Sequence, residues 1–281
     1  WKAPKYVHTA QLMKMDGGSK RKLSKRKDPE LALDFYNAEG YPVPSVLEYL
    51  MTLLNSNFED WRLANPTAPM GDFQFTTKKM GNSGSLFDID KLKDVSKNTI
   101  SVMSADQVYD EVTAWAKDFD PQLYTLLTAD EQKAKAIFAI GRGGAKPRKD
   151  IAIWSEVKDY VAFFYEELFT AASEYPENVS TQDALDILTQ YRSLYSPADD
   201  GETWFNKVRE LGESLGFAAK PKDYKKNPDQ YKGHVGDVSQ VIRLAITGRT
   251  NSPDLCSVMQ ILGEEVCQQR LAQAIELLSN R

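Results

Sequence analysis

Along most of this chain, apolar residues recur at intervals of three or four positions, the spacing of one face of an α-helix. In the stretch that begins at Pro44, the apolar positions are Val46, Leu47, Leu50, Met51 and Leu54. In the last stretch they are Cys267, Leu271, Ala274, Ile275 and Leu278. Each set lies on one side of a helix and leaves the other side polar, so both stretches are predicted to form amphipathic helices.

Residues typical of helix ends place two further helices. Asp28 and Pro29 suit the start of a helix that ends just before Gly40. Pro253 suits the start of another, and Gly263 suits its end. Two sequences fit a capping box, in which side chains satisfy the first free backbone amides of a helix: Ser104–Gln107 and Thr128–Glu131.

The remaining pattern predicts one long helix and little strand. An amphipathic helix is expected over residues 156–172, an edge strand over 6–12 and a short extended piece over 73–75. Loops rich in Pro, Gly or Lys are expected at 65–72, 141–149 and 218–233. The chain is therefore predicted to be mainly α, with a short α/β segment at its start.

Charge is distributed unevenly over the 281 residues. The formal net charge is −5, but residues 1–27 hold nine Lys or Arg against a single acid, Asp16, so the rest carries −13. This asymmetry favours a positive end that meets an anion. No apolar run approaches 18 residues, and Cys256 and Cys267 lack metal-ligand spacing. A cytoplasmic protein without a membrane segment or a metal site is expected.

Residues 17–27, called the basic loop below, carry the main candidate chemistry. Gly17 and Gly18 free the backbone, and eight of the nine residues that follow are Lys, Arg or Ser. A loop that grips phosphate needs a mobile backbone, several cations and a hydroxyl group, and this run supplies all three. A solvated basic loop and a nucleic-acid patch are alternative interpretations of such a run.

The core of the basic loop, Lys22-Leu23-Ser24-Lys25-Arg26, resembles the second signature of class I aminoacyl-tRNA synthetases in its glutamyl-type form. Three more segments follow in order: Glu39–Pro42, Leu86–Leu92 and Arg243–Arg249. In this order and spacing, the four segments are similar to the C-terminal part of bacterial glutamate–tRNA ligases. The resemblance extends over nearly the whole chain, and four ordered matches are more specific than any one of them.

The resemblance implies a modular plan. Residues 1–30 would end the class I catalytic domain, as a short α/β remnant of a nucleotide-binding fold. Residues 31–103 would form a helical stem-contact domain, and 104–281 a helical anticodon-binding domain that could divide near 218–235. The family's first signature, His-x-Gly-His, is absent around His8 and His234, and the chain does not begin with Met. A piece of a longer protein is therefore expected, unable to form glutamyl-adenylate alone.

The resemblance also implies that the basic loop acts on ATP. Lys25 is expected to stabilise charge on the leaving pyrophosphate in the transition state, with Lys22 as the second catalytic cation. Lys22, Ser24 and Lys25 would bind ATP, which brings Mg²⁺ with it. Neither metal ligands nor a tightly bound cofactor is expected in this chain.

The other members of the basic loop are given supporting roles. Gly17 and Gly18 are expected to act as hinges, Leu23 to pack in the core and Asp16 to tether the loop. A general attraction for phosphate is expected of Lys20, Arg21 and Lys27.

Two basic segments and one arginine are candidates for contact with tRNA. RNA is recognised through its phosphates and through bases stacked on aromatic or Arg side chains. The residues predicted to bind tRNA are Arg142, Lys146, Arg148, Lys149, Lys222, Lys225, Lys226 and Arg249. A solvated loop is the alternative for the segment around Lys146, and Arg243 is expected to brace helices.

The predicted function is the tRNA-binding C-terminal part of a ligase that activates glutamate with ATP and transfers it to tRNA. The expected partners are tRNA(Glu), ATP and glutamate, without DNA or a membrane, and a monomer is expected. Two alternatives stay open: a non-enzymatic helical RNA-binding or scaffold protein with a basic arm, and a glutaminyl-tRNA ligase. The helical second half disfavours the latter, because the eukaryotic-type family reads the anticodon with β-barrels.

Overall fold

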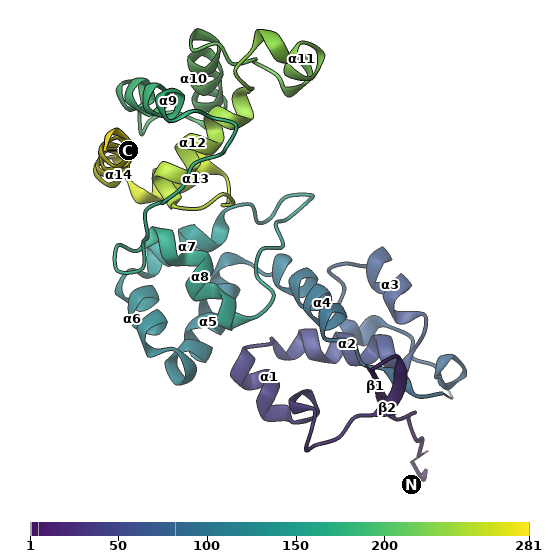
Figure 1. The fold of residues 1–281 in the computed structure, drawn as a ribbon. Coiled ribbons are helices and arrows are strands. Elements are labelled where there is room, and N and C mark those ends of the chain that lie inside the picture. Colours follow the sequence, from purple (N-terminus) through teal and green to yellow (C-terminus); the bar gives the residue numbers. More distant parts are fainter. Residues whose placement is uncertain (1, 5, 82, 281) are drawn as a thin grey trace. The chain divides into compact units, whose positions relative to one another are not determined.

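The computed structural model describes residues 2–4, 6–81 and 83–280, and it consists of two compact units (Figure 1). The first unit ends at Tyr160 and the second begins at Val161. The described residues form fourteen α-helices, six short 3-10 helices and one three-stranded sheet. The prediction of a mainly helical chain with a short α/β segment at its start is therefore confirmed.

The first unit contains the sheet and the helices up to α8. Its strands are β1 (Leu12–Asp16), β2 (Ser19–Lys22) and β3 (Ser85–Leu86). Its helices are α1 (Leu33–Glu39), α2 (Val43–Leu54), α3 (Phe58–Ala64), α4 (Ile89–Ser101), α5 (Ala105–Phe119), α6 (Pro121–Ala129) and α7 (Glu131–Ala139). The last helix, α8 (Val157–Val161), reaches the division between the units.

The sheet is small and has the strand order β2-β1-β3. β1 pairs antiparallel with β2, with Met13 opposite Lys22, and parallel with β3, with Leu12 opposite Ser85. The predicted strand over residues 6–12 is wrong in position, because residues 6–11 are outside any strand. The hairpin turn fixes the register of β1 and β2, and that pairing begins only after Leu12.

The basic loop is attached to one core of the first unit. The buried members of this core are Leu23, Tyr41, Tyr49, Phe87, Leu92 and Ile153. α2 packs against α4 here, and the Tyr49 and Phe87 rings meet edge to face at 5.3 Å. The predicted helix after Pro44 is confirmed as α2, although its fully buried positions are Ser45 and Tyr49.

The helix predicted between Asp28 and Gly40 is interrupted. A 3-10 helix covers Pro29–Leu31, Ala32 is extended, and α1 follows. Asp28 caps neither helix with its side chain, because its carboxylate is bonded to the basic loop. The predicted end is confirmed, since Gly40 adopts a left-handed conformation with φ 79°.

The two predicted capping boxes have different outcomes. Ser104 and Gln107 form theirs at the start of α5, with bonds of 3.1 and 2.8 Å. The box at Thr128 is wrong, because this hydroxyl donates to the Tyr124 carbonyl oxygen inside α6. Asp130 caps α7 instead by accepting from the Lys133 amide at 2.9 Å.

The described residues of the second unit form a bundle of six α-helices. They are α9 (Thr181–Leu194), α10 (Gly201–Ser214), α11 (Pro221–Lys226), α12 (Val235–Thr247), α13 (Leu255–Leu262) and α14 (Glu264–Ser279). α9 packs against α14 and α12, and α10 packs against α12. The helices predicted after Pro253 and at the end of the chain are confirmed as α13 and α14, and Gly263 separates them.

The long helix predicted over residues 156–172 is wrong. α8 ends at Val161, a 3-10 helix covers Ala162–Phe164, and Tyr165 is extended. Phe163, Phe164 and Tyr165 are all buried. Three consecutive residues on a helix point in three directions 100° apart, so one apolar face could not bury them all.

Two smaller predictions also need correction. Residues 73–75 form no strand, and Phe73 packs its ring edge to face on Phe58 at 5.0 Å. The expected loop at 218–233 contains α11 and a 3-10 helix over Pro228–Gln230. The loop at 141–149 has no regular structure, as expected. The boundaries predicted at residues 30 and 103 stay predictions, whereas the two compact units divide at Tyr160.

Candidate functional site

A tight hairpin forms the first part of the basic loop. Gly17 and Gly18 connect β1 to β2, with φ values of 53° and 87°. A two-residue turn of this kind needs positive φ at both positions, and glycine adopts it without a steric cost. The two glycines therefore have a definite structural place as the hairpin turn, and hinge motion at these positions stays a prediction.

The family-like segment follows directly on the hairpin. Lys22 ends β2, and the Leu23 side chain, only 4% exposed, enters the core as expected. The Leu23 amide donates to the Leu12 carbonyl oxygen at 3.1 Å. The chain then turns at Ser24, whose carbonyl oxygen accepts from the Lys27 and Asp28 amides at 3.0 and 2.9 Å. The loop backbone is thus anchored on both sides of Leu23.

The three residues predicted to bind ATP present polar groups on this turn. Lys22 and Lys25 are exposed, and within the described part of the chain neither side chain has an ion pair. Ser24 is half-buried, and its hydroxyl oxygen accepts from the Arg26 amide at 3.4 Å. The turn therefore offers two exposed cations and one hydroxyl group to an anion, a donor set that suits the phosphates of a nucleotide.

Asp28 is the residue of this site that the sequence interpretation missed. It is 2% exposed, and its two carboxylate oxygens accept from the two terminal nitrogens of Arg21 at 2.7 and 2.8 Å. One of these oxygens also accepts from the Ser24 amide at 2.7 Å. The Arg21 guanidinium, followed by the Ser24 amide, holds the pKa of the Asp28 carboxyl well below its usual range. Its position directly after residues 17–27, a run of eleven residues without an acid, was the available signal.

Arg21 has specific partners within the protein. Besides Asp28, its Nε donates to the Asp16 carboxylate at 2.6 Å, which confirms Asp16 as a tether of the loop. These two carboxylates, Asp28 first, raise the pKa of the Arg21 guanidinium. Lys14 on β1 lies 3.8 Å from Asp28 and is ion-paired with Glu30. Arg21, predicted to attract phosphate in general, is therefore part of the framework that holds the loop.

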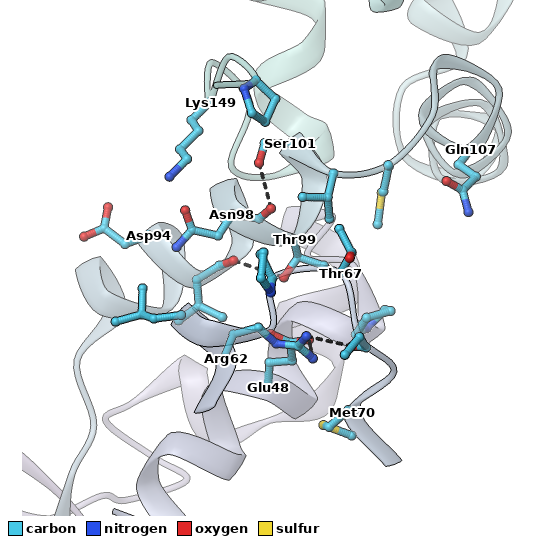
Figure 2. Close-up of a pocket in the computed structure, with 18 of the residues that line it drawn as sticks. Glu48, Arg62, Thr67, Met70, Asp94, Asn98, Thr99, Ser101, Gln107 and Lys149 are labelled. Carbon is cyan, nitrogen blue, oxygen red and sulfur yellow. Dashed lines mark hydrogen bonds and ion pairs between the residues drawn. The ribbon is translucent and has the colours of Figure 1, made fainter. Parts of the chain in front are cut away.

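A large groove of about 1280 Å³ lies elsewhere in the first unit, between α3, α4 and the 141–149 loop (Figure 2). Arg62 lies on its wall, where its Nη2 donates to Glu48 at 2.6 Å and its guanidinium lies 4.9 Å from the Trp61 ring centroid. Exposed apolar side chains also line the groove: Leu47, Leu63 and Val102. Lys149 projects at its edge (Figure 2).

The 141–149 loop divides its four cations between two roles. The Arg142 guanidinium is held by the carbonyl oxygens of Phe138 and Ile100, both at 2.6 Å, and burial lowers its pKa. Arg148 donates to both oxygens of Asp150 at 2.6 and 2.9 Å. Lys146 and Lys149 are exposed. Arg142 therefore joins the ends of α7 and α4, while the two lysines extend into solvent.

The second candidate RNA segment lies on α11 in the second unit. Lys222, Lys225 and Lys226 are all exposed, and no ion pair is found for them within the described residues. The Tyr224 ring meets the His234 ring edge to face at 5.7 Å, which joins α11 to the start of α12. α11 thus presents three cations from one short helix.

Arg243 and Arg249 occupy different positions near the end of α12. The Arg243 guanidinium donates to the carbonyl oxygens of Ser252 and Pro253 at 3.3 and 3.2 Å, which confirms its bracing role. Arg249 is half-buried and follows Gly248, which ends α12 with φ 70°. Its backbone amide donates to the Thr247 hydroxyl at 3.2 Å. Arg249 therefore lies at a loop edge, as expected.

No group of three or more His, Cys, Asp or Glu within the described residues could hold a metal ion. None of the helices in the described ranges is long and apolar enough to cross a membrane.

Comparison with known families decides what kind of chain this is. The family profile described as "Anticodon binding domain" matches residues 107–275, which is more than half of the sequence. The chain belongs to the anticodon-binding domain family. This match starts in α5 of the first unit and includes most of the second.

The relatives of this chain confirm the resemblance drawn from its motifs. It is 48% identical to the glutamate–tRNA ligase of Acetivibrio thermocellus over 275 residues, which are 98% of the chain and 50% of that ligase. It is 39% identical to the glutamate–tRNA ligase of Sorangium cellulosum, over 95% of the chain and 50% of that ligase. The chain thus spans about half the length of these curated relatives.

A solved structure has a similar fold. The glutamate tRNA ligase from Elizabethkingia meningosepticum, crystallised in complex with its amino acid, aligns with a TM-score of 0.65 at 19% identity. The alignment covers 98% of this chain and 52% of that one. At this identity the likeness establishes the fold.

Proposed function

We propose that this chain is the tRNA-binding part of a glutamate–tRNA ligase, and that its basic loop binds the phosphates of ATP during glutamate activation. The proposal is supported chiefly by one observation, the loop in which Lys22 and Lys25 extend into solvent while Leu23 is anchored in the core. The identity of the chain to glutamate–tRNA ligases points to the reaction. A non-enzymatic RNA-binding protein would use the same cations on an RNA backbone, so it is this identity that favours the ligase.

The proposed chemistry follows from the charges that develop during activation. The glutamate carboxylate attacks the α-phosphate of ATP, and negative charge grows on the departing pyrophosphate. A cation that reaches those oxygens only in the transition state lowers the barrier without tightening ATP binding. We assign that role to Lys25, with Lys22 second and the Ser24 hydroxyl as a donor. Mg²⁺ would arrive with ATP and neutralise part of its phosphate charge.

We propose tRNA(Glu) as the macromolecular partner, bound through the exposed cations of two segments. Lys146 and Lys149 belong to the first segment, together with Arg148, and the lysines of α11 form the second. Arg249 is retained as a further contact at its loop edge. Arg142 is the weakest of the predicted contacts, because its guanidinium already serves two carbonyl oxygens. We place the ligase in the cytoplasm as a monomer that binds neither DNA nor a membrane.

Substitution of Lys25 tests the proposed chemistry. In the ligase produced from the complete gene, Lys25→Ala should lower kcat for glutamate-dependent ATP–pyrophosphate exchange by about 10²–10³ and leave the KM for ATP within a few fold. Lys117, an exposed lysine of α5, supplies the matched control Lys117→Ala. Equal rates for the two variants would remove Lys25 from the mechanism.

A second assay tests the amino acid and the tRNA. The wild-type ligase should attach glutamate to tRNA(Glu) in preference to the other amino acids. Crosslinks from tRNA(Glu) should map to Lys146 or Lys149 and to α11. Charging with glutamine alone would favour a glutaminyl ligase, and crosslinking without any charging would favour the non-enzymatic alternative.

A further inference from the structure

Asp28 closes a short ring of chain around the family-like segment. Its carboxylate is almost completely buried, and a buried carboxylate is costly unless it is paired and hydrogen-bonded. Here Arg21 donates to both oxygens as a fork, and the Ser24 amide donates to one of them. Arg21 precedes Lys22, and Asp28 follows Lys27. The contact therefore joins the chain before the segment to the chain after it.

The same contact fixes the backbone that carries Lys25. Ser24 is held on both of its polar backbone groups: its amide donates to Asp28, and its carbonyl oxygen accepts from the Lys27 and Asp28 amides. Lys25 is the next residue, so the origin of its flexible side chain is set by this turn. A lysine carries its charge at the end of a long, flexible side chain, so the position of its backbone determines which groups that charge can reach.

The contact also selects which cations are available. Asp28 and Asp16 occupy the Arg21 guanidinium, whereas Lys22 and Lys25 have no ion pair among the residues described. Without Asp28, Arg21 would become a further mobile cation beside the two lysines. Arg21 would then compete with Lys25 for the phosphates and hold them away from the position where they react.

We propose that Asp28 is the positioning residue of the basic loop, acting through Arg21 and the Ser24 amide to hold Lys25 where a transition-state anion forms. This inference rests on the proposed function, since it assigns Asp28 to the same ATP-binding loop. Asp28 itself touches no substrate. Its effect is on the rate of activation.

The test measures the rate constant of adenylate formation in a single turnover with the ligase in excess. Asp28→Asn keeps the size of the side chain but places an amide against the Arg21 fork. This rate constant should fall by about 10–100-fold, because a displacement of about 1 Å in a catalytic group can cost 10²-fold. The KM for ATP should change less than threefold. Asp34→Asn makes the same chemical change at an exposed position of α1 and should leave the rate unchanged.

A second variant separates positioning from stability. Arg21→Lys keeps the positive charge but cannot bridge both oxygens of Asp28, so it should slow the same step. The double variant should be no slower than Asp28→Asn alone, because the two side chains act as one unit. A purely structural role would reduce only the amplitude of the turnover, which counts folded enzyme, and not its rate constant.

Each outcome assigns failure to one proposal. A wild-type ligase without glutamate activation would overturn the proposed function. An active wild type, together with an Asp28→Asn rate constant equal to that of Asp34→Asn, would overturn the role of Asp28 alone. If Asp28→Asn does not fold, Arg21→Lys decides: a folded Arg21→Lys ligase with a wild-type rate constant overturns the inference, and a slowed one supports it.

Discussion

Neutralising the lysines of α11 should change how tRNA binding depends on salt. The variant replaces Lys222, Lys225 and Lys226 with Gln, which removes three charges and keeps side chains of good helix propensity. All three lysines are exposed and extend from one six-residue helix, so they can approach neighbouring phosphates together. Lys232 is left in place because it is paired with Asp183 at 2.5 Å.

The expected magnitude follows from counterion release. Each phosphate that a cation neutralises contributes about 0.7 in a single strand, and about 0.9 in a duplex, to the slope of log affinity against log salt. Three lost contacts should therefore flatten that slope by about 2–3. Between 50 and 200 mM KCl, wild-type affinity should fall about 20–40-fold more than that of the variant.

The assay is a filter-binding titration of tRNA(Glu) at several KCl concentrations. The matched control replaces three other exposed lysines, Lys78, Lys79 and Lys117, with Gln and should keep the wild-type slope within about 1. Equal slopes for wild type and the α11 variant would show that α11 makes no phosphate contact. Equal slopes for the two variants would mean that net charge, not position, controls binding.

Three further predictions concern stability and pH. Gly40→Ala should destabilise the first unit by about 2–4 kcal/mol in thermal unfolding, because Gly40 has φ 79° and an added Cβ would lie 2.6 Å from the Trp154 Cβ. The control Gly71→Ala should be near neutral in the same measurement, because a Cβ added there meets nothing within 4 Å. Arg270→Met should lower the free energy of unfolding of the second unit by about 3 kcal/mol in urea, because the carbonyl oxygens of the buried residues Phe163 and Ile246 lose their donor. A loss under about 1 kcal/mol would contradict this account. Burial raises the pKa of the Cys267 thiol to about 11, so the folded state holds this proton more tightly than the unfolded chain does. The thiol therefore contributes its full stabilisation below about pH 9, and this stabilisation is lost as the pH rises through about 11. Cys267→Ala should make the decline in melting temperature over this pH range shallower.

Features that depend on near neighbours in the chain could be predicted from the sequence. The left-handed end of α1 at Gly40 and the capping box between Ser104 and Gln107 each involve residues within four positions. The apolar stripe of α14 is likewise a repeat of three and four. The basic loop was found for the same reason, because its cations and its hydroxyl are consecutive.

Features that depend on distant partners could not be predicted in this way. Residues 156–172 have the pattern of one helix, but α8 ends at Val161. Just after this end, the Phe163 carbonyl oxygen accepts a hydrogen bond from Arg270, which lies more than a hundred positions later in the sequence. Arg142 has the composition of an RNA contact, yet Ile100 and Phe138 supply the carbonyl oxygens that hold it. No local pattern contains these partners.

Asp28 separates the information that is local in the sequence from the contacts that only folding creates. The sequence alone determined that this chain is mainly helical, carries a basic loop and resembles a glutamate–tRNA ligase, because composition, periodicity and short motifs are local properties. It placed Asp28 at the start of a helix, as its residue type suggests. Only the folded hairpin brings Arg21 within 2.8 Å of both its oxygens. The sequence suggests a helix cap at Asp28, but in the folded chain its buried carboxylate holds the basic loop. This burial is possible because the hydrogen bonds from Arg21 and the Ser24 amide offset the cost of burying a charge.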